Sequence, residues 1–210
     1  NRKECYIREF SIEHFHDSKV FETLIPKICK IFREENEELT GFENEEILAE
    51  YQIYKTPGYV YMKGNVQIYS AGKQAADISA FPEGIAVAVG SEEDVPDICP
   101  DQTIDKVFTI ENLTSFYRFK QEHSLVIYLG GYHNHSRRNL LMQIYQKLPD
   151  AQYYHFGDLD AGGFYILEHL KRKTGIPFQM FQMDIETLKK YEDYAKPLTE
   201  NDKKRLMQLE

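Results

Sequence analysis

Three acidic residues follow two short apolar segments of the chain. Glu111 comes directly after residues 107–110, while Asp158 and Asp160 follow residues 152–156 within a glycine-flanked Asp-x-Asp triplet. Aspartates two positions apart just past a strand can both reach one cation, and the glycines let a backbone or phosphate group come close. Carboxylates that leave coordination positions open suit Mg²⁺ or Mn²⁺, which keep waters and accept phosphate oxygens. The pattern therefore predicts a divalent-metal site.

A structural role for the same triplet remains an alternative. An Asp-x-Asp beside glycine is commonly a turn or a helix cap, and Asp160 could cap the helix expected after it. Glu111, at the end of an earlier strand, favours the metal site, because the carboxyl ends of parallel strands meet at one edge of a sheet.

The segment 130–138 supplies further candidates. It runs from the end of an expected strand to the start of an expected helix, so it lies at the same edge of the sheet as the acids. A solvated loop with Ser136 as the helix N-cap is the alternative. A zinc site is not expected, for want of further nitrogen or sulfur ligands nearby. The candidate phosphate contacts, helped by the N–H groups of the helix start, are His133, His135, Arg137 and Arg138.

Two other polar residues have weaker cases. His155 lies in an apolar strand, where a hydrogen-bonded core or rim histidine is more common than a catalyst. Asp184 ends the last expected strand, and it could provide a distant fourth acid or cap a helix starting at Ile185.

Regular alternation of strands and helices positions these residues. It predicts a parallel sheet with helices on both faces, because parallel neighbours require crossover connections. Strands are expected at 107–110, 125–129, 152–156 and 178–183, and helices at 112–120, 136–147 and 163–173.

The preceding region has a different pattern. Apolar residues from Val20 to Phe32 recur at helical spacing, and Pro26 either kinks this helix or begins a second piece. We place a boundary near residue 102, which separates a smaller α+β region, 1–101, from a catalytic domain, 102–210. The other elements expected are a helix at 45–54, a β-hairpin from 59–62 and 66–69 through Lys63-Gly64-Asn65, a strand at 84–89 and an acidic connector at 91–101.

Composition sets outer limits on function. The 210 residues are 42% hydrophobic, enough for one or two packed cores, and no stretch resembles a membrane span or a signal peptide, so a soluble, cytoplasmic protein is expected. The three cysteines form no C-x-x-C pair. The net charge of -9 argues against gripping nucleic acid with this chain alone. The first residue is Asn1, so we expect an upstream portion to be missing.

The acidic motifs resemble those of known families. Residues 109–112, followed about 47 residues after Glu111 by residues 157–160, resemble the Toprim signature, a glutamate after the first strand and an Asp-x-Asp after a later one. From 107 to 184 the chain resembles the JetD family, nuclease subunits of bacterial Wadjet plasmid-defence systems. The likeness is weaker at 57–90 and absent before residue 50. The segments that carry it are 111–116, 128–132, 138–141 and 156–164.

This resemblance implies a Toprim-type, Rossmann-like sheet and a DNA endonuclease related to the A subunit of topoisomerase VI and to Spo-type proteins. Position by position, Asp158 and Asp160 would hold Mg²⁺ or Mn²⁺, and Glu111 would complete the site or manage a proton. The implied partners are DNA and the SMC-like and kleisin subunits of a defence complex, and a homodimer is a further option.

Two other functions stay open. A type IIB topoisomerase-like transesterase would need a tyrosine nucleophile, and the fifteen tyrosines do not single one out. A non-catalytic Toprim scaffold that recruits SMC-like partners is the other. Three converging carboxylates argue against the scaffold, because their mutual repulsion costs stability without a cation.

Overall fold

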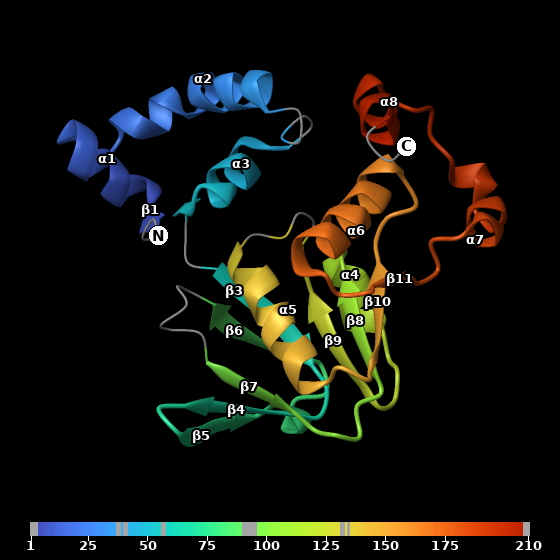
Figure 1. Ribbon diagram of the computed structural model, residues 1–210. Helices are drawn as coiled ribbons and strands as arrows, with labels where there is room; N and C mark the ends of the chain where they lie inside the picture. Colours follow the sequence, from blue (N-terminus) through green and yellow to red (C-terminus); the bar gives the residue numbers. More distant parts are fainter. Residues whose placement is uncertain are drawn as a thin grey trace.

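The chain folds as a mixed α/β protein. The computed structural model describes residues 4–36, 39, 42–55, 58–89, 96–130, 133 and 135–207. A six-stranded sheet carries helices on both faces, a three-stranded sheet lies beside it, and a helical unit formed by the first part of the chain lies beyond its edge (Figure 1).

The four strands expected after residue 102 form the parallel part of the large sheet. They are β8 (Lys106–Ile110), β9 (Ser124–Tyr128), β10 (Gln152–Phe156) and β11 (Gln179–Met180), in the order β11-β10-β8-β9. The last strand is shorter than the 178–183 expected. Two earlier strands, β3 (Gly58–Lys63) and β6 (Ile85–Val89), extend the sheet in antiparallel fashion beyond β9.

Helices cover both faces of the parallel strands, as the alternation predicted. One cluster packs α5 (His135–Lys147) and α6 (Ala161–Thr174) against Val107, Leu125 and Tyr153. The other face carries α4 (Leu113–Arg118), whose Phe116 packs on Phe108. Successive side chains of a strand point to opposite faces, so β8, which is covered on both faces, is buried from Val107 to Ile110.

The order of the strands places a reversal between β8 and β10. From β8 the chain crosses through α4 to β9 on one side, then returns through α5 to β10 on the other side of β8. In open α/β sheets, ligands bind beyond the carboxyl ends of the strands at such a reversal. Glu111 follows β8 and Asp158 follows β10, so both acids stand at this point.

The expected β-hairpin is wrong. β3 belongs to the large sheet, whereas β4 (Val66–Ser70) pairs with β5 (Lys73–Asp77) and β7 (Asp97–Pro100) in the small sheet. The intervening Gly64 has φ 139°, and a Cβ there would lie 2.5 Å from the carbonyl oxygen of Ser124. The glycine therefore forms a corner between two sheets, pressed against the start of β9.

The acidic connector is also partly wrong. The expected range 91–101 contains β7, an edge strand of the small sheet. Residues 91–95 lie outside the described residues. The strand expected at 84–89 is confirmed as β6.

The first part of the chain forms its own small core. The expected amphipathic helix is confirmed as α2 (Val20–Glu35), which continues through Pro26 as one helix and buries Phe21, Ile25 and Cys29. It packs with α1 (Ile7–Phe15) and α3 (Asn44–Glu50). The helix expected at 45–54 ends at Glu50, because residues 53–54 form β2 (Ile53–Tyr54), which pairs with β1 (Cys5–Tyr6).

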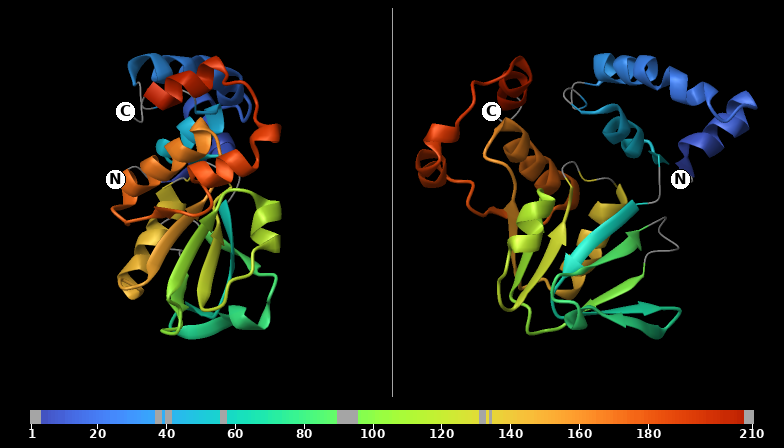
Figure 2. Two further views of the ribbon diagram at one scale, coloured as in Figure 1. Left: turned by 90° about the vertical axis from the view of Figure 1, so that its right-hand side faces the viewer. Right: turned by 180° about the vertical axis from the view of Figure 1, so that it is seen from behind.

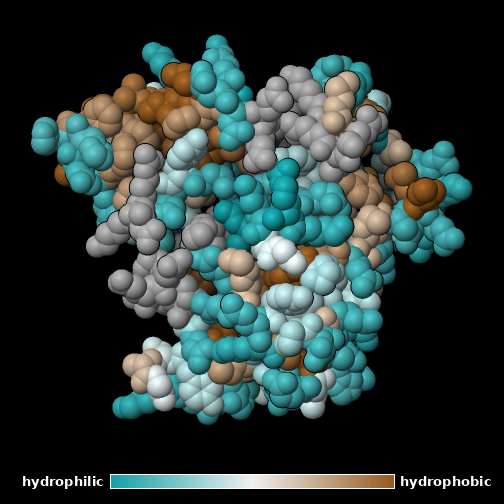
Figure 3. All heavy atoms as spheres, viewed as in Figure 1, coloured by the Kyte–Doolittle hydropathy of each residue, from teal (hydrophilic) through white to brown (hydrophobic). Residues whose placement is uncertain are grey.

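Two helical segments flank the end of the sheet at which the acids lie. Figures 1 and 2 show α1 to α3 on one side, and α7 (Ile185–Lys190) with α8 (Glu200–Met207) on the other. Short 3₁₀ turns stand at Ile78–Ala80 (η2) and Glu192–Tyr194 (η3). Apolar residues are exposed over α1 and α2 and again near α7 (Figure 3), and they include Ile12, Phe15, Ile31 and Ile185. In the described part of the chain, each helix is too short or too polar to cross a membrane.

Candidate metal centre at the strand reversal

Glu111 and Asp158 are brought into contact by two adjacent strands. β8 and β10 pair in parallel with Ile110 opposite Phe156, and the N–H of Glu111 donates to the carbonyl of Phe156 at 3.0 Å. The backbone N–H of Asp158 then donates to Oε2 of Glu111 at 3.3 Å. The carboxylate of Glu111 and the backbone of Asp158, 47 positions apart in the sequence, therefore meet at one edge of the sheet.

Gly157 makes this approach possible. A Cβ on Gly157 would lie 2.8 Å from Oε2 of Glu111 and 2.8 Å from Nε2 of His155. Its N–H donates to Sδ of Met183 at 3.2 Å, which anchors the backbone from below. A side chain at this position would displace Glu111, so the glycine is part of the site.

His155 lies beneath the acids as a neutral ring. It is fully buried, and its Nδ1 lies 2.9 Å from Oγ1 of Thr109 on β8. Burial lowers the pKa of His155 to about 4. Its Nε2 has no hydrogen-bond partner among the described residues. The histidine is a core residue, as the sequence favoured, and its Nε2 borders the same space at Gly157 as Oε2 of Glu111.

Asp160 has the structural role that the sequence left open. It is the N-cap of α6, with Oδ1 accepting from the N–H of Gly163 at 2.8 Å. Gly163 is required here because a Cβ would collide with the backbone carbonyl of Asp158. Burial raises the pKa of Asp158, and the neighbouring charge of Asp160 raises it further. The two aspartates thus repel each other across the turn.

The donor set fits a hard divalent cation by its chemistry. Within the described ranges, no three acidic, histidine or cysteine side chains converge closely enough to form a complete metal site. Glu111 and Asp158 supply an adjacent pair of oxygen-bearing groups, and Asp160 keeps one carboxylate oxygen that the cap does not use. The first two are already together, whereas Asp160 would have to contribute its second oxygen.

The expected phosphate contacts fall into different places. Nη1 of Arg137 donates to the carbonyl of Leu129 at 2.6 Å, just beyond β9, so this guanidinium lies near the active rim. Burial lowers the pKa of Arg137. The side chain of His135 lies outside the described residues. Ser136 is buried inside α5 and does not precede it, so the alternative in which this residue caps the helix is wrong.

Arg138 and His133 point into the protein. Arg138 is 6% exposed, and it pairs with Glu50 of α3 at 2.8 Å and donates to the carbonyl of His133 at 2.9 Å. His133 is fully buried, with Nε2 3.4 Å from Nδ1 of His169 on α6. Arg138 holds α5 against α3, and His133 packs on α6, so neither side chain lies at the edge of the sheet with the acids.

Asp184 caps α7, accepting from the N–H of Thr187 at 2.7 Å, which was one of its two expected roles.

Two supporting residues of the site escaped sequence reasoning. Met183 accepts from the N–H of Gly157, and Thr109 lies against His155. No signal in the sequence indicated Met183. Thr109 could have been found, because it and His155 are each the penultimate residue of a strand, and the parallel sheet sets them opposite each other.

Comparison with known proteins identifies relatives of the chain. Residues 93–210 match the family model described as "Wadjet protein JetD, C-terminal". The Wadjet protein JetD of Bacillus cereus (strain Q1) is 30% identical over 207 residues, which cover 96% of this chain and 50% of that protein. The chain therefore spans half the length of this curated relative.

Proposed function

The chain belongs to the JetD family, and we propose that it forms the catalytic part of a metal-dependent DNA endonuclease of a bacterial anti-plasmid defence system. The observation that carries this proposal is the contact of Glu111 with Asp158 at the strand reversal. Acids at this edge, with an Asp-x-Asp on one strand and a glutamate on its neighbour, fit a Toprim-type site.

Each residue has a defined task in this proposal. Asp158 and Asp160 would hold Mg²⁺ or Mn²⁺, and Glu111 would complete the site or accept a proton from the attacking water. A bound Mg²⁺ would polarise the phosphodiester, neutralise developing charge and lower the pKa of that water. His155, neutral and buried, would help to shape the floor of the site, because its Nε2 borders the same space at Gly157 as Oε2 of Glu111. Arg137, whose Nη1 donates to the carbonyl of Leu129 just beyond β9, is the cation to which we assign a phosphate contact.

Partner subunits would supply the attraction for DNA that this acidic chain lacks. A net charge of -9 does not attract a phosphate backbone, so we propose that SMC-like and kleisin subunits of a defence complex bring DNA to the site in the cytoplasm. A second copy of the chain would provide the second site that cutting both strands requires.

The test is cleavage of supercoiled plasmid by the full-length protein with its partner subunits and Mg²⁺. We expect Glu111→Gln and Asp158→Asn each to lower the rate by about a hundredfold or more. Asp105→Asn is the matched control, because Asp105 is an exposed acid just before β8, at the opposite end of the strand that Glu111 follows.

Three results would count against the proposal. Cleavage that survives both substitutions would remove these acids from the mechanism. A covalent protein–DNA adduct would indicate a tyrosine transesterase. Plasmid binding without cleavage by the wild type in Mg²⁺ and in Mn²⁺ would indicate a scaffold.

A further inference from the structure

A separate pocket of about 620 Å³ opens at the other end of the large sheet. It lies where β3 ends and β9 begins, on the face that carries α4, so it is remote from the carboxyl ends of β8 and β10. The volume is within the range of sites for small organic ligands, about 300–1,000 Å³. Its polar lining includes Lys63, Asn65, Ser79, Lys120 and Gln121.

Lys63 is a buried cation on the wall of this pocket. It is 6% exposed, and its Nζ donates to the carbonyls of Phe116 at 2.6 Å and Tyr117 at 3.3 Å in the last turn of α4. An ammonium has three protons, so one remains for a ligand. In the described part of the chain, no carboxylate forms an ion pair with Lys63.

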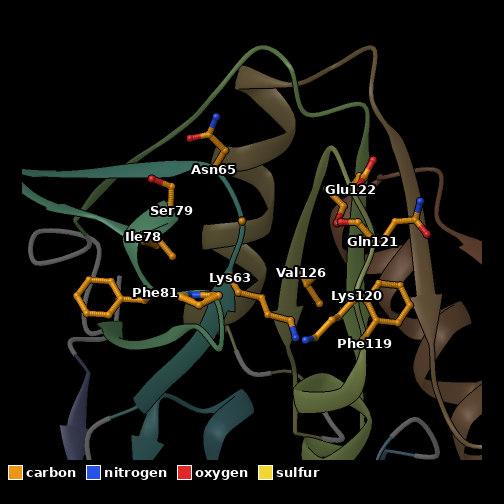
Figure 4. A pocket seen from close by; sticks show the side chains of 13 residues that line it. Lys63, Asn65, Ile78, Ser79, Phe81, Phe119, Lys120, Gln121, Glu122 and Val126 are labelled. Carbon is orange, nitrogen blue, oxygen red and sulfur yellow. The ribbon is translucent and has the colours of Figure 1, made fainter.

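A second cation faces the first. Figure 4 shows the side chain of Lys120 reaching into the pocket with its amino group directed toward that of Lys63. Burial lowers the pKa of Lys63, the carboxylate of Glu83 opposes this, and the charge of Lys120 lowers the pKa further. Two neighbouring ammonium groups repel each other, and an anion bound to both would relieve this repulsion.

We propose that this pocket binds a small organic phosphate of mononucleotide size, with its phosphate on Lys63 and Lys120. The aromatic rings of Phe81 and Phe119, at the two sides of the pocket in Figure 4, offer faces for a planar group. Asn65, Ser79 and Gln121 supply donors and acceptors for its polar edge.

A small ligand fits this charge distribution better than a nucleic acid strand does. Glu122 lines the same pocket, and Glu83 acts on Lys63 from nearby. An extended polyanion would run past these carboxylates, whereas a single phosphate can remain between the two lysines. The inference does not depend on the proposed endonuclease, because it uses no residue of the acidic centre.

The experiment is isothermal titration calorimetry of the full chain with adenosine 5′-monophosphate, adenosine and inorganic phosphate, at one ionic strength set with sodium chloride. We expect the monophosphate to bind, and adenosine to bind at least about tenfold more weakly. Lys120→Gln should lower the affinity for the monophosphate by about tenfold, because it removes one of the two cations that hold the phosphate. The Lys120 side chain is exposed, so we expect this variant to fold normally.

Control variants make the result specific. Lys189→Gln, on exposed α7, removes the same charge outside the pocket and should leave the affinity unchanged. Lys63→Met should abolish binding, and circular dichroism will establish whether that variant is folded. The proposal is overturned if no heat of binding is seen with millimolar monophosphate, if both glutamine variants weaken it equally, or if inorganic phosphate or adenosine binds as tightly.

Discussion

Gly157 is the residue on which the position of Glu111 depends. Alanine there would bring a Cβ within 2.8 Å of Glu111 Oε2. We expect Gly157→Ala to lower plasmid cleavage by about ten- to a hundredfold, because displacing a reacting group by about 1 Å has effects of that size. The measurement is the cleavage rate beside the midpoint of thermal unfolding.

Gly72→Ala is the control for that substitution. Gly72 has φ 74°, and a Cβ there would meet nothing within 4 Å. Alanine should cost about 1 kcal/mol of stability through backbone strain and leave cleavage intact. Wild-type cleavage by Gly157→Ala would mean that Glu111 does not need its present position.

The repulsion between Asp158 and Asp160 gives a test of metal binding without catalysis. Mg²⁺ at ten times its dissociation constant should raise the free energy of unfolding of the wild type by about 1.4 kcal/mol. Asp158→Asn removes one of the two like charges, so in EDTA it should unfold at a higher temperature than the wild type and gain little from Mg²⁺. An equal Mg²⁺ effect on both proteins would show that Asp158 is not a ligand.

At the scale of elements, one buried ion pair joins α3 to α5. The side chains of Arg138 and Glu50 are 7% and 19% exposed, and Nη1 lies 2.8 Å from Oε1. Arg138→Met should lower the free energy of unfolding by about 3 kcal/mol, because it leaves a largely buried carboxylate unpaired. Urea unfolding measures this.

The double variant completes the test of this pair. Arg138→Met with Glu50→Met should be more stable than the sum of the single effects predicts, since the unpaired charge is then removed. If Arg138→Met kept full stability and instead weakened DNA binding, this result would support the phosphate contact that the sequence predicted for Arg138.

The contact of His133, which precedes α5, with His169 of α6 makes stability depend on pH. Burial lowers the pKa of His169 to about 3, with nearby Lys173, Arg138 and Arg172 acting in the same direction, and burial lowers the pKa of His133 well below its ordinary value. In the unfolded chain these two histidines take up protons near pH 6.5, so below that pH the unfolded chain holds more protons than the native state. Stability is therefore full above pH 6.5 and is lost as pH falls toward 3.

We expect the free energy of unfolding to fall by about 1.4 kcal/mol per pH unit for each histidine that stays neutral in the native state. Urea unfolding at pH 7, 6 and 5 measures it. His169→Gln should flatten the curve, whereas His14→Gln, at an exposed position of α1, should not. A curve that His169→Gln leaves unchanged would assign the acid sensitivity to other groups.

At the scale of the whole molecule, the large sheet crosses the boundary expected near residue 102. β3 and β6 precede that residue, and their Val60, Met62 and Val89 belong to the same core as Leu125 and Ile127 of β9. A fragment 102–210 would expose to solvent the edge of β9 and the apolar side chains that β3 and β6 cover. We expect it to show no cooperative thermal unfolding.

A fragment 58–210 is the matched comparison. It keeps the six-stranded and the three-stranded sheet, so circular dichroism should show cooperative unfolding, at a lower temperature than the complete chain because Arg138 loses Glu50. Cooperative unfolding of 102–210 would support the boundary as the sequence placed it.

The sequence by itself determined the alternating elements after residue 102 and the location of the acids. Strand and helix periodicity is local, and so are caps such as Asp160 and Asp184, whose partners stand three residues away. That Glu111 and Asp158 meet also followed from the sequence, because parallel strands end at one edge.

Only the tertiary structure decided which strands pair and which polar groups are buried. Residues 59–69 have the composition of a hairpin, yet the backbone turns into the small sheet at Gly64, and β3 pairs with β9 and β6 of the large sheet. Arg138 looked like a rim cation until Glu50, 88 positions away, was placed against it. Pairing between distant segments depends on the burial of shared apolar surface, which local propensity does not encode.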